Sequence, residues 1–221
     1  MTWVKICGMT NLEDALVAVD AGADAVGFVF YEKSPRCVSV ETAREIVAKL
    51  PENVEKVGVF VGGSYDDVAE VMRRCGLTIA QIYPRESLAI TDEFFRDFPF
   101  RIILAISMGL SDEQEFAGFY LASNAREKVV AALVDSGNSE SPGGTGEKFD
   151  WRKIAGLTDA IDLKLVLAGG LKVENVGDAV AMLKPWGVDV ASGVEARPGK
   201  KDPEKVRAFV RAVREMDRKV S

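Results

Sequence analysis

Residues 165–191 read LVLAGGLKVENVGDAVAMLKPWGVDVA and contain one complete strand–helix–strand unit. The two ends of this stretch, Leu165–Ala168 and Val188–Ala191, are apolar almost throughout, which is typical of parallel strands that are covered on both faces. Between them, apolar residues recur at i, i+3, i+4 and i+7, a spacing that predicts one helical face turned toward a core. These residues are Val176, Ala179, Val180 and Leu183. The stretch therefore predicts a parallel α/β architecture.

The same unit repeats along the whole chain. Four other segments carry the helical spacing: Leu12/Ala15/Leu16/Val19, Ala43/Ile46/Val47/Leu50, Val68/Val71/Met72/Cys75 and Val206/Phe209/Val210/Val213. Six further apolar runs resemble strands: Val4–Ile6, Ala25–Phe30, Lys56–Val61, Ile79–Tyr83, Arg101–Ile106 and Val129–Val134. Eight strands, each followed by a helix at about 28 residues per unit, predict a closed parallel (β/α)8 TIM barrel. The alternative, a doubly wound open sheet, predicts no contact between the first and the last strand.

The chain is expected to form a single domain over residues 1–221. Its longest irregular stretch, Ser136–Lys148, is typical of a functional lid or a disordered loop and does not divide the chain. Four pairs of residues indicate where helices begin: Thr10 with Glu13, Ser64 with Asp67, Ser111 with Gln114, and Asp202 with Pro203.

Composition excludes several classes of function. The chain has 28 Lys and Arg residues against 34 Asp and Glu, a net charge of −6, so it lacks the basic surface that nucleic acid requires. Neither a signal-peptide pattern nor an apolar run of membrane-spanning length is present, so no membrane partner is expected. Cys7, Cys37 and Cys75 form no Cys-x-x-Cys pair, which indicates free thiols in a reducing cytoplasm.

The sequence contains no histidine. This excludes Ser-His-Asp and Cys-His nucleophilic pairs as well as His-ligated zinc. Acid–base chemistry must therefore depend on Asp, Glu, Cys, Lys or Tyr.

Polar residues and glycines follow the predicted strands at their carboxyl ends, where barrels of this kind form their active sites. Gly169-Gly170 and Ser192-Gly193-Val194 end the last two strands and are candidates for phosphate binding through backbone N–H groups. Either pair alone is more typical of simple turn glycines, whereas both together at adjacent strand ends favour phosphate.

Five ionisable residues are candidates for the chemistry. Cys7 ends the first strand and is either a small buried residue or a base, with Lys5 on the same side of the strand able to favour the thiolate. Asp135 ends the sixth strand and is either a loop cap or an acid. Asp189 lies within the eighth strand and, in a closed barrel, Lys5 is its candidate partner. Arg36 is either a solvated arginine or a clamp for a carboxylate.

These residues belong to motifs that resemble the phosphoribosylanthranilate isomerase family over nearly the whole chain. The motifs are Lys5–Thr10, Gly27–Phe30, Ser34–Arg36, Leu133–Ser136, Gly143–Gly146, Phe149–Trp151, Leu167–Leu171, Glu174–Val176, Gly187–Glu195 and Pro198–Asp202.

The resemblance implies an Amadori rearrangement of N-(5′-phosphoribosyl)anthranilate to 1-(2-carboxyphenylamino)-1-deoxyribulose 5-phosphate in tryptophan biosynthesis. It implies that Asp135 is the general acid, that Cys7 is the general base, that Arg36 holds the anthranilate carboxylate, and that Asp189 lies near the reacting amine. The other implied contacts are Lys5, Gln81 and Gly144 to the substrate and Gly169, Gly170, Ser192, Gly193 and Val194 to its phosphate. The resemblance implies neither a metal nor an organic cofactor, and a monomer or a homodimer.

The end of the fourth strand departs from the family pattern. The family commonly shows Gln-Leu-His-Gly, where this chain has Gln81-Ile82-Tyr83-Pro84. A tyrosine can supply a hydroxyl in the same region, but proline changes the path of the loop. Two alternatives therefore remain, another phosphosugar isomerase on the same barrel and a non-catalytic phosphate-ligand-binding relative.

Overall fold

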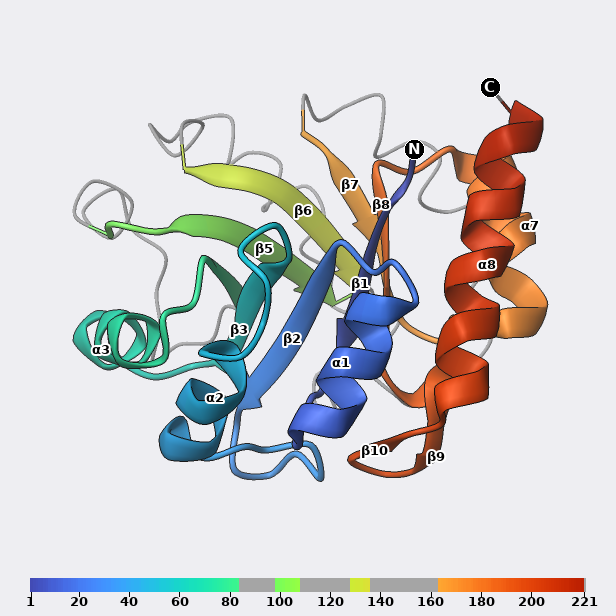
Figure 1. Cartoon of the computed structure of the whole chain (residues 1–221). Coiled ribbons are helices and arrows are strands. Elements are labelled where there is room, and N and C mark those ends of the chain that lie inside the picture. The colour runs from blue at the N-terminus through green and yellow to red at the C-terminus, as the bar shows by residue number, and fades with distance from the viewer. Residues whose placement is uncertain (84–97, 108–127, 136–162, 221) are drawn as a thin grey trace.

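The computed structural model describes residues 1–83, 98–107, 128–135 and 163–220 (Figure 1). Its elements are β1 (Trp3–Cys7), α1 (Leu12–Asp20), β2 (Ala25–Phe30), α2 (Val40–Val47), β3 (Glu55–Val61), α3 (Tyr65–Cys75), β4 (Ile79–Tyr83), β5 (Arg101–Ser107), β6 (Val129–Asp135), β7 (Leu165–Leu167), α7 (Val173–Leu183), β8 (Gly187–Val190), the 3₁₀ helix η3 (Ser192–Val194), β9 (Glu195–Arg197), β10 (Lys200–Lys201) and α8 (Pro203–Val220). All eight predicted strands are present, with ends within one residue of the predicted ones. The helices predicted after β4, β5 and β6 fall outside the described residues.

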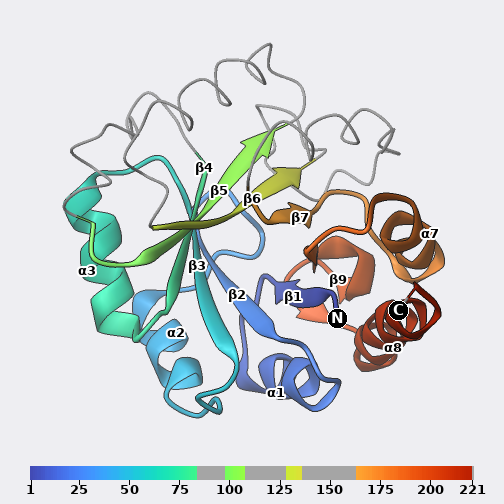
Figure 2. The same cartoon turned by 90° about the horizontal axis from the view of Figure 1, so that it is seen from above.

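The eight strands close into a parallel barrel in the order β1 to β8, as the view from above shows (Figure 2). The closing pair is β1 and β8, in which Lys5 lies opposite Asp189. The first and last strands are therefore neighbours, which confirms the barrel and excludes the open sheet.

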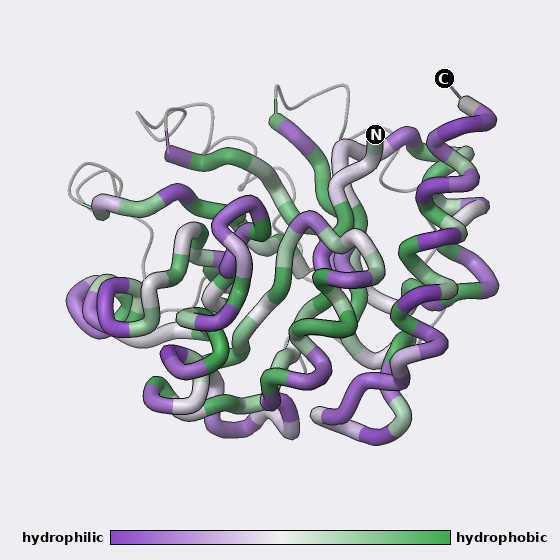
Figure 3. The backbone as a smooth tube through the Cα atoms, viewed as in Figure 1, coloured by the Kyte–Doolittle hydropathy of each residue, from purple (hydrophilic) through white to green (hydrophobic). Residues whose placement is uncertain are grey.

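Apolar side chains form two layers around this sheet. One cluster includes Ala25, Val57 and Leu133 from the strands, and the other joins strand residues such as Phe28 to helix residues such as Phe209. Successive side chains of a strand point to opposite faces, so each strand supplies both the barrel interior and the layer beneath the helices. This explains why the strands are apolar almost throughout, whereas the helices carry polar residues on one side (Figure 3).

Most predicted helical faces are turned toward the core. The four residues predicted for the second helix are all buried, although Leu50 lies just past the end of α2. The four residues predicted for α8 are also all buried. In α1 the prediction was wrong for Leu16, which is 38% exposed, whereas Ala15 is buried and Leu12 and Val19 pack against the core. Asp14 and Ala18, which were not predicted, are also buried. The α1 helix turns Asp14 inward because its carboxylate accepts hydrogen bonds from Lys200 and Lys201. Across the described ranges, no helix is both long and apolar enough to span a membrane.

Of the four predicted helix starts, the one at Ser111 lies outside the described residues, and two of the other three are correct. Ser64 accepts from the Asp67 N–H at the start of α3, and Asp202 does the same for two N–H groups of α8. At α1 the cap is Asn11 rather than Thr10, because the Thr10 hydroxyl donates to the Gly199 carbonyl instead.

The β9–β10 hairpin is an element that sequence periodicity did not predict. It is antiparallel and follows η3 directly after β8. In Figure 1 it lies at the lower end of the view, the end toward which the β2 arrowhead points. The hairpin therefore lies beside the carboxyl ends of the strands.

Candidate active site

A pocket opens at the carboxyl ends of the strands. Its wall combines apolar strand residues with charged side chains and with the backbone of the loops after β7 and β8. The predicted site residues that line it are Cys7, Arg36, Gln81, Asp135, Gly169, Gly170, Asp189 and Ser192. One pocket therefore brings together residues that are spread over most of the chain.

A buried ion pair joins the first strand to the last beside this pocket. Lys5 Nζ lies 2.9 Å from Asp189 Oδ1, and the Lys5 side chain is 0% exposed. This confirms the predicted Lys5–Asp189 pair. Gly27 on the neighbouring strand β2 leaves room for the side chains of Lys5 and Cys7. A Cβ at Gly27 would lie 2.7 Å from Cys7 Sγ and 3.0 Å from Lys5 Cε.

Two opposing effects act on the pKa of the Cys7 thiol: its burial and the nearby Lys5 ammonium. Burial raises the pKa of the Cys7 thiol, and the nearby Lys5 ammonium lowers it by a smaller amount. The net shift is upward, so the expectation that Lys5 favours the thiolate is right in direction, although burial outweighs it. Burial also disfavours the charged form of Lys5, but Asp189 and Cys7 outweigh it and raise the Lys5 pKa.

A second set of polar side chains links β4 to β6 at the pocket. The Tyr83 hydroxyl donates to Asp135 Oδ2 over 2.9 Å, and the Gln81 amide nitrogen lies 3.4 Å from the Tyr83 oxygen. Burial and the adjacent Asp135 raise the Tyr83 pKa well above 10.0, so this hydroxyl stays a donor. Gln81 Oε1 is buried and has no hydrogen-bond partner among the described residues, which leaves an acceptor on the pocket wall.

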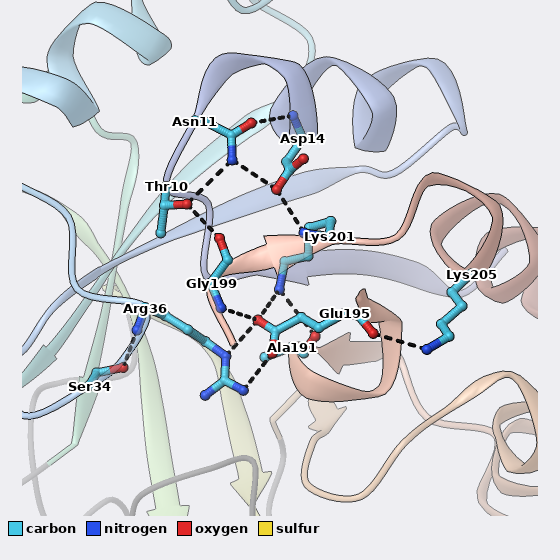
Figure 4. Close-up of polar contacts among 10 residues, drawn as sticks. All are labelled: Thr10, Asn11, Asp14, Ser34, Arg36, Ala191, Glu195, Gly199, Lys201 and Lys205. Carbon is cyan, nitrogen blue, oxygen red and sulfur yellow. Dashed lines mark hydrogen bonds and ion pairs between the residues drawn. The ribbon is translucent and has the colours of Figure 1, made fainter. Parts of the chain in front are cut away.

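Arg36 is held by a carboxylate from the far end of the chain (Figure 4). Its Nε and Nη2 atoms each lie 2.8 Å from an oxygen of Glu195, in a two-pronged ion pair. Lys201 Nζ lies 2.9 Å from Glu195 Oε1 and is also hydrogen-bonded to the Ala191 carbonyl. Arg36 is thus a fixed part of the pocket wall rather than a solvated surface arginine.

The β9–β10 hairpin that carries this carboxylate is anchored to the start of α1. Asp14 accepts from the Lys201 backbone N–H over 2.7 Å (Figure 4). It also accepts from Lys200 Nζ over 2.6 Å. The Thr10 hydroxyl donates to the Gly199 carbonyl over 2.6 Å. These contacts connect the loop after β8 to the loop after β1.

The predicted phosphate loops lie side by side at the pocket. Gly169 and Gly170 have φ of 75° and 64°, which favours glycine at both positions. A Cβ at Gly193 would lie 2.0 Å from the Leu171 carbonyl oxygen, so glycine is what lets the two loops approach. Gly193 packs against Leu171 and the Val194 side chain is buried in the outer core, while Ser192 lines the pocket.

Two residues of this arrangement had no assigned role from sequence, Glu195 and Lys201, although both lie in quoted motifs. Tyr83 was expected only to supply a hydroxyl in this region, and its hydroxyl donates to Asp135. Gly144 lies outside the described residues. Among the described residues, no group of three His, Cys, Asp or Glu side chains is placed to hold a metal ion.

Comparison with known proteins gives one consistent result. The sequence model of the family described as N-(5′-phosphoribosyl)anthranilate (PRA) isomerase matches residues 4–212. The N-(5′-phosphoribosyl)anthranilate isomerase of Citrifermentans bemidjiense is 46% identical over 95% of this chain and 96% of its own length.

Solved structures agree with this result. The phosphoribosylanthranilate isomerase of Thermotoga maritima superposes with a TM-score of 0.84 at 39% identity, covering 97% of this chain and all of that one. A phosphoribosylanthranilate isomerase in complex with reduced 1-(o-carboxyphenylamino)-1-deoxyribulose 5-phosphate has a TM-score of 0.81 at 38% identity, with 97% and 100% coverage.

Proposed function

Because this chain belongs to the N-(5′-phosphoribosyl)anthranilate isomerase family, we propose that it catalyses the Amadori rearrangement of N-(5′-phosphoribosyl)anthranilate. The product is 1-(2-carboxyphenylamino)-1-deoxyribulose 5-phosphate, an intermediate of tryptophan biosynthesis. The observation that carries the proposal is that Cys7, Asp135 and Arg36 line one pocket.

In this reaction Asp135 acts as the general acid. It protonates the furanose ring oxygen, the bond from that oxygen to C1′ breaks, and the amine lone pair forms an iminium. The Tyr83 hydroxyl, which donates to Asp135 Oδ2, holds the carboxyl in place during this step. The tyrosine thereby supplies a contact on the side of the pocket where the family motif is altered.

Cys7 acts as the general base in the following step. Its thiolate removes the proton from C2′, and the electron pair moves to the iminium nitrogen to give an enolamine, which tautomerises to the ketone. The Lys5–Asp189 pair lies beside the thiol and adds no net charge of its own. Because burial raises the Cys7 pKa, the reactive thiolate is a minor form at neutral pH.

The substrate is held at its two charged ends. Arg36 binds the anthranilate carboxylate, and the backbone of Gly169, Gly170 and the Ser192–Val194 segment binds the phosphate. This places the sugar between Cys7 and Asp135. Neither a metal nor an organic cofactor is needed, since one acid and one base complete the proton transfers.

The test follows the loss of substrate fluorescence, with N-(5′-phosphoribosyl)anthranilate generated in situ. We expect turnover by the wild type and a loss of at least about 100-fold in Cys7→Ser and in Asp135→Asn. Cys37→Ser and Asp66→Asn are the matched controls, because both residues are exposed and neither lines the pocket. Both controls should keep wild-type turnover.

Other outcomes would identify the alternatives. A wild type that binds the reduced product analogue without turnover would indicate a non-catalytic relative. Turnover of another phosphosugar alone would indicate a different isomerase on the same barrel. Undiminished activity in the two site variants would refute the assigned acid and base.

Three further predictions concern the whole molecule. We propose one domain over residues 1–221, a cytoplasmic location, and a monomer or a homodimer. The isomerase of T. maritima is described as dimeric, with monomers generated from it. Light scattering of the purified chain decides between the two states for this protein.

A further inference from the structure

We infer that Glu195 is a positioning residue that, together with Lys201, holds the Arg36 guanidinium ready to receive the carboxylate of the substrate. The inference rests on the proposed function, in which Arg36 binds that carboxylate. It assigns a role to the β9–β10 hairpin, which lies outside the eight strand–helix units.

The first support is the way in which Glu195 uses the donors of Arg36. An arginine has five N–H donors in a planar fork, and Glu195 takes one on Nε and one on Nη2. The other three lie on Nη1 and Nη2, at the outer end of the fork. That end presents two parallel N–H groups, the geometry that binds a second carboxylate in a two-pronged contact.

The second support is that the Glu195 carboxylate is itself fixed. Oε1 accepts hydrogen bonds from Lys201 Nζ over 2.9 Å and from the Gly199 N–H over 3.3 Å (Figure 4). The stem of Arg36 is also confined, since a Cβ on Gly8 would lie 2.7 Å from Arg36 Cδ. A long arginine side chain ordinarily loses rotamer freedom on binding, and these contacts remove that freedom beforehand.

The third support is the charge of the cluster. Arg36 and Lys201 are two cations against the single carboxylate of Glu195, and their side chains are 13%, 0% and 5% exposed. Burial works against the charged form of Glu195, but its bonds to Arg36 and Lys201 outweigh this and lower its pKa. With Lys201 protonated, the cluster carries one positive charge in excess, which an incoming carboxylate would neutralise.

The test compares two ligands in the wild type and in Glu195→Gln. One ligand is reduced 1-(o-carboxyphenylamino)-1-deoxyribulose 5-phosphate, and the other is the same compound without the carboxyl group. By calorimetry we expect the wild type to bind the first about 10- to 100-fold more tightly. In Glu195→Gln this preference should fall below about threefold, whereas affinity for the ligand without the carboxyl should stay within about twofold.

Kinetics with the natural substrate give a second readout. We expect KM to rise at least about tenfold in Glu195→Gln while kcat changes less than about threefold, because the acid and the base are untouched. The matched control is Glu215→Gln, which removes the same charge from an exposed position on α8. It should leave the ligand preference at the wild-type value.

A second pair of variants covers the case in which Glu195→Gln does not fold. Lys201→Met keeps the Arg36–Glu195 contact, and Glu195→Gln/Lys201→Met removes the carboxylate together with the buried ammonium. In Lys201→Met the ligand preference should be smaller than in the wild type, because the excess positive charge is gone, but should stay above about threefold. In the double variant it should be lost.

Two results would overturn the inference. One is a preference that survives in Glu195→Gln, and the other is an equal loss of affinity for both ligands, which would indicate a structural role. A wild type without any preference for the carboxylated ligand would instead show that Arg36 does not bind this carboxylate.

Discussion

Replacing Lys5 by methionine tests the ion pair that closes the barrel. Methionine keeps an unbranched side chain of similar length but removes the ammonium that lies 2.9 Å from Asp189 Oδ1. The two side chains are 0% and 9% exposed and lie opposite each other on β1 and β8. In Lys5→Met the Asp189 carboxylate therefore stays in the barrel interior without this cation.

The expected cost is large for one substitution. Breaking a buried ion pair by removing one partner destabilises a protein by about 3–5 kcal/mol. Since the free energy of unfolding of a domain is about 5–15 kcal/mol, this is about a fifth or more of the total. For a chain of this length it corresponds to a fall in Tm of about 6–20 °C.

The pH dependence of this contribution follows from the raised Lys5 pKa. A lysine whose pKa is raised on folding stabilises the folded state fully below its ordinary value of 10.5. The contribution is lost as pH rises through the higher folded value. Measurement at pH 7 therefore captures the whole effect of the ion pair.

Urea unfolding followed by circular dichroism at pH 7 measures the change. The exposed Lys33→Met is the matched control and should lie within about 0.5 kcal/mol of the wild type. In Lys5→Met/Asp189→Asn the second charge is also gone, so we expect at least about 1 kcal/mol to be regained over Lys5→Met. A Lys5→Met variant as stable as the wild type, or a double variant less stable than Lys5→Met, would refute the reasoning.

Three more predictions concern the pocket. In a Cys37→Ser background, mass spectrometry should show alkylation of Cys7 with a midpoint above pH 9.0, because burial raises its pKa, and a midpoint below that value would contradict this. Tyr83→Phe should lower kcat at least about tenfold, since it removes a hydrogen bond to the proposed acid; unchanged kcat would show that this bond is not used. Gly193→Ala should lower Tm and weaken binding of inorganic phosphate, because its Cβ would lie 2.0 Å from a carbonyl oxygen of the preceding loop. Gly177→Ala in α7 should instead add about 0.5–1 kcal/mol of stability, and equal Tm values for the two variants would contradict this account.

The amino-acid sequence was sufficient to predict the strands and their order. A strand covered on both faces must be apolar on both, so runs such as Ala25–Phe30 could be recognised without any partner. The alternation of side chains along a strand also placed Lys5 and Cys7 on one side of β1. Once eight units implied closure, Lys5 and Asp189 became neighbours, and the structure confirms their pairing.

Local patterns were less reliable where a distant contact competes with them. Thr10 matches a capping signal, but its hydroxyl bonds to Gly199, and Asn11 caps the helix. Asp14 occupies a polar position of a helical pattern, yet it is buried because it binds the Lys201 backbone N–H and the Lys200 side chain of the β9–β10 hairpin. Periodicity describes the preferences of one segment taken alone. It cannot predict contacts between that segment and residues far away in the chain.

The pairing of β1 with β8, which closes the barrel, is a property of the tertiary structure. What the sequence by itself determined is the eight strands, their ends and the side chains that could carry acid–base chemistry, because these depend on patterns within short segments. Only the tertiary structure decided how those side chains are held. Arg36 is bound by Glu195, 159 positions away, and Tyr83 by Asp135, 52 positions away. The tertiary structure also decided the direction of the Cys7 pKa shift, because burial raises this pKa by more than the nearby Lys5 charge lowers it. The burial of the Cys7 thiol and the closeness of the Lys5 charge both depend on how the whole chain packs around the sulfur atom.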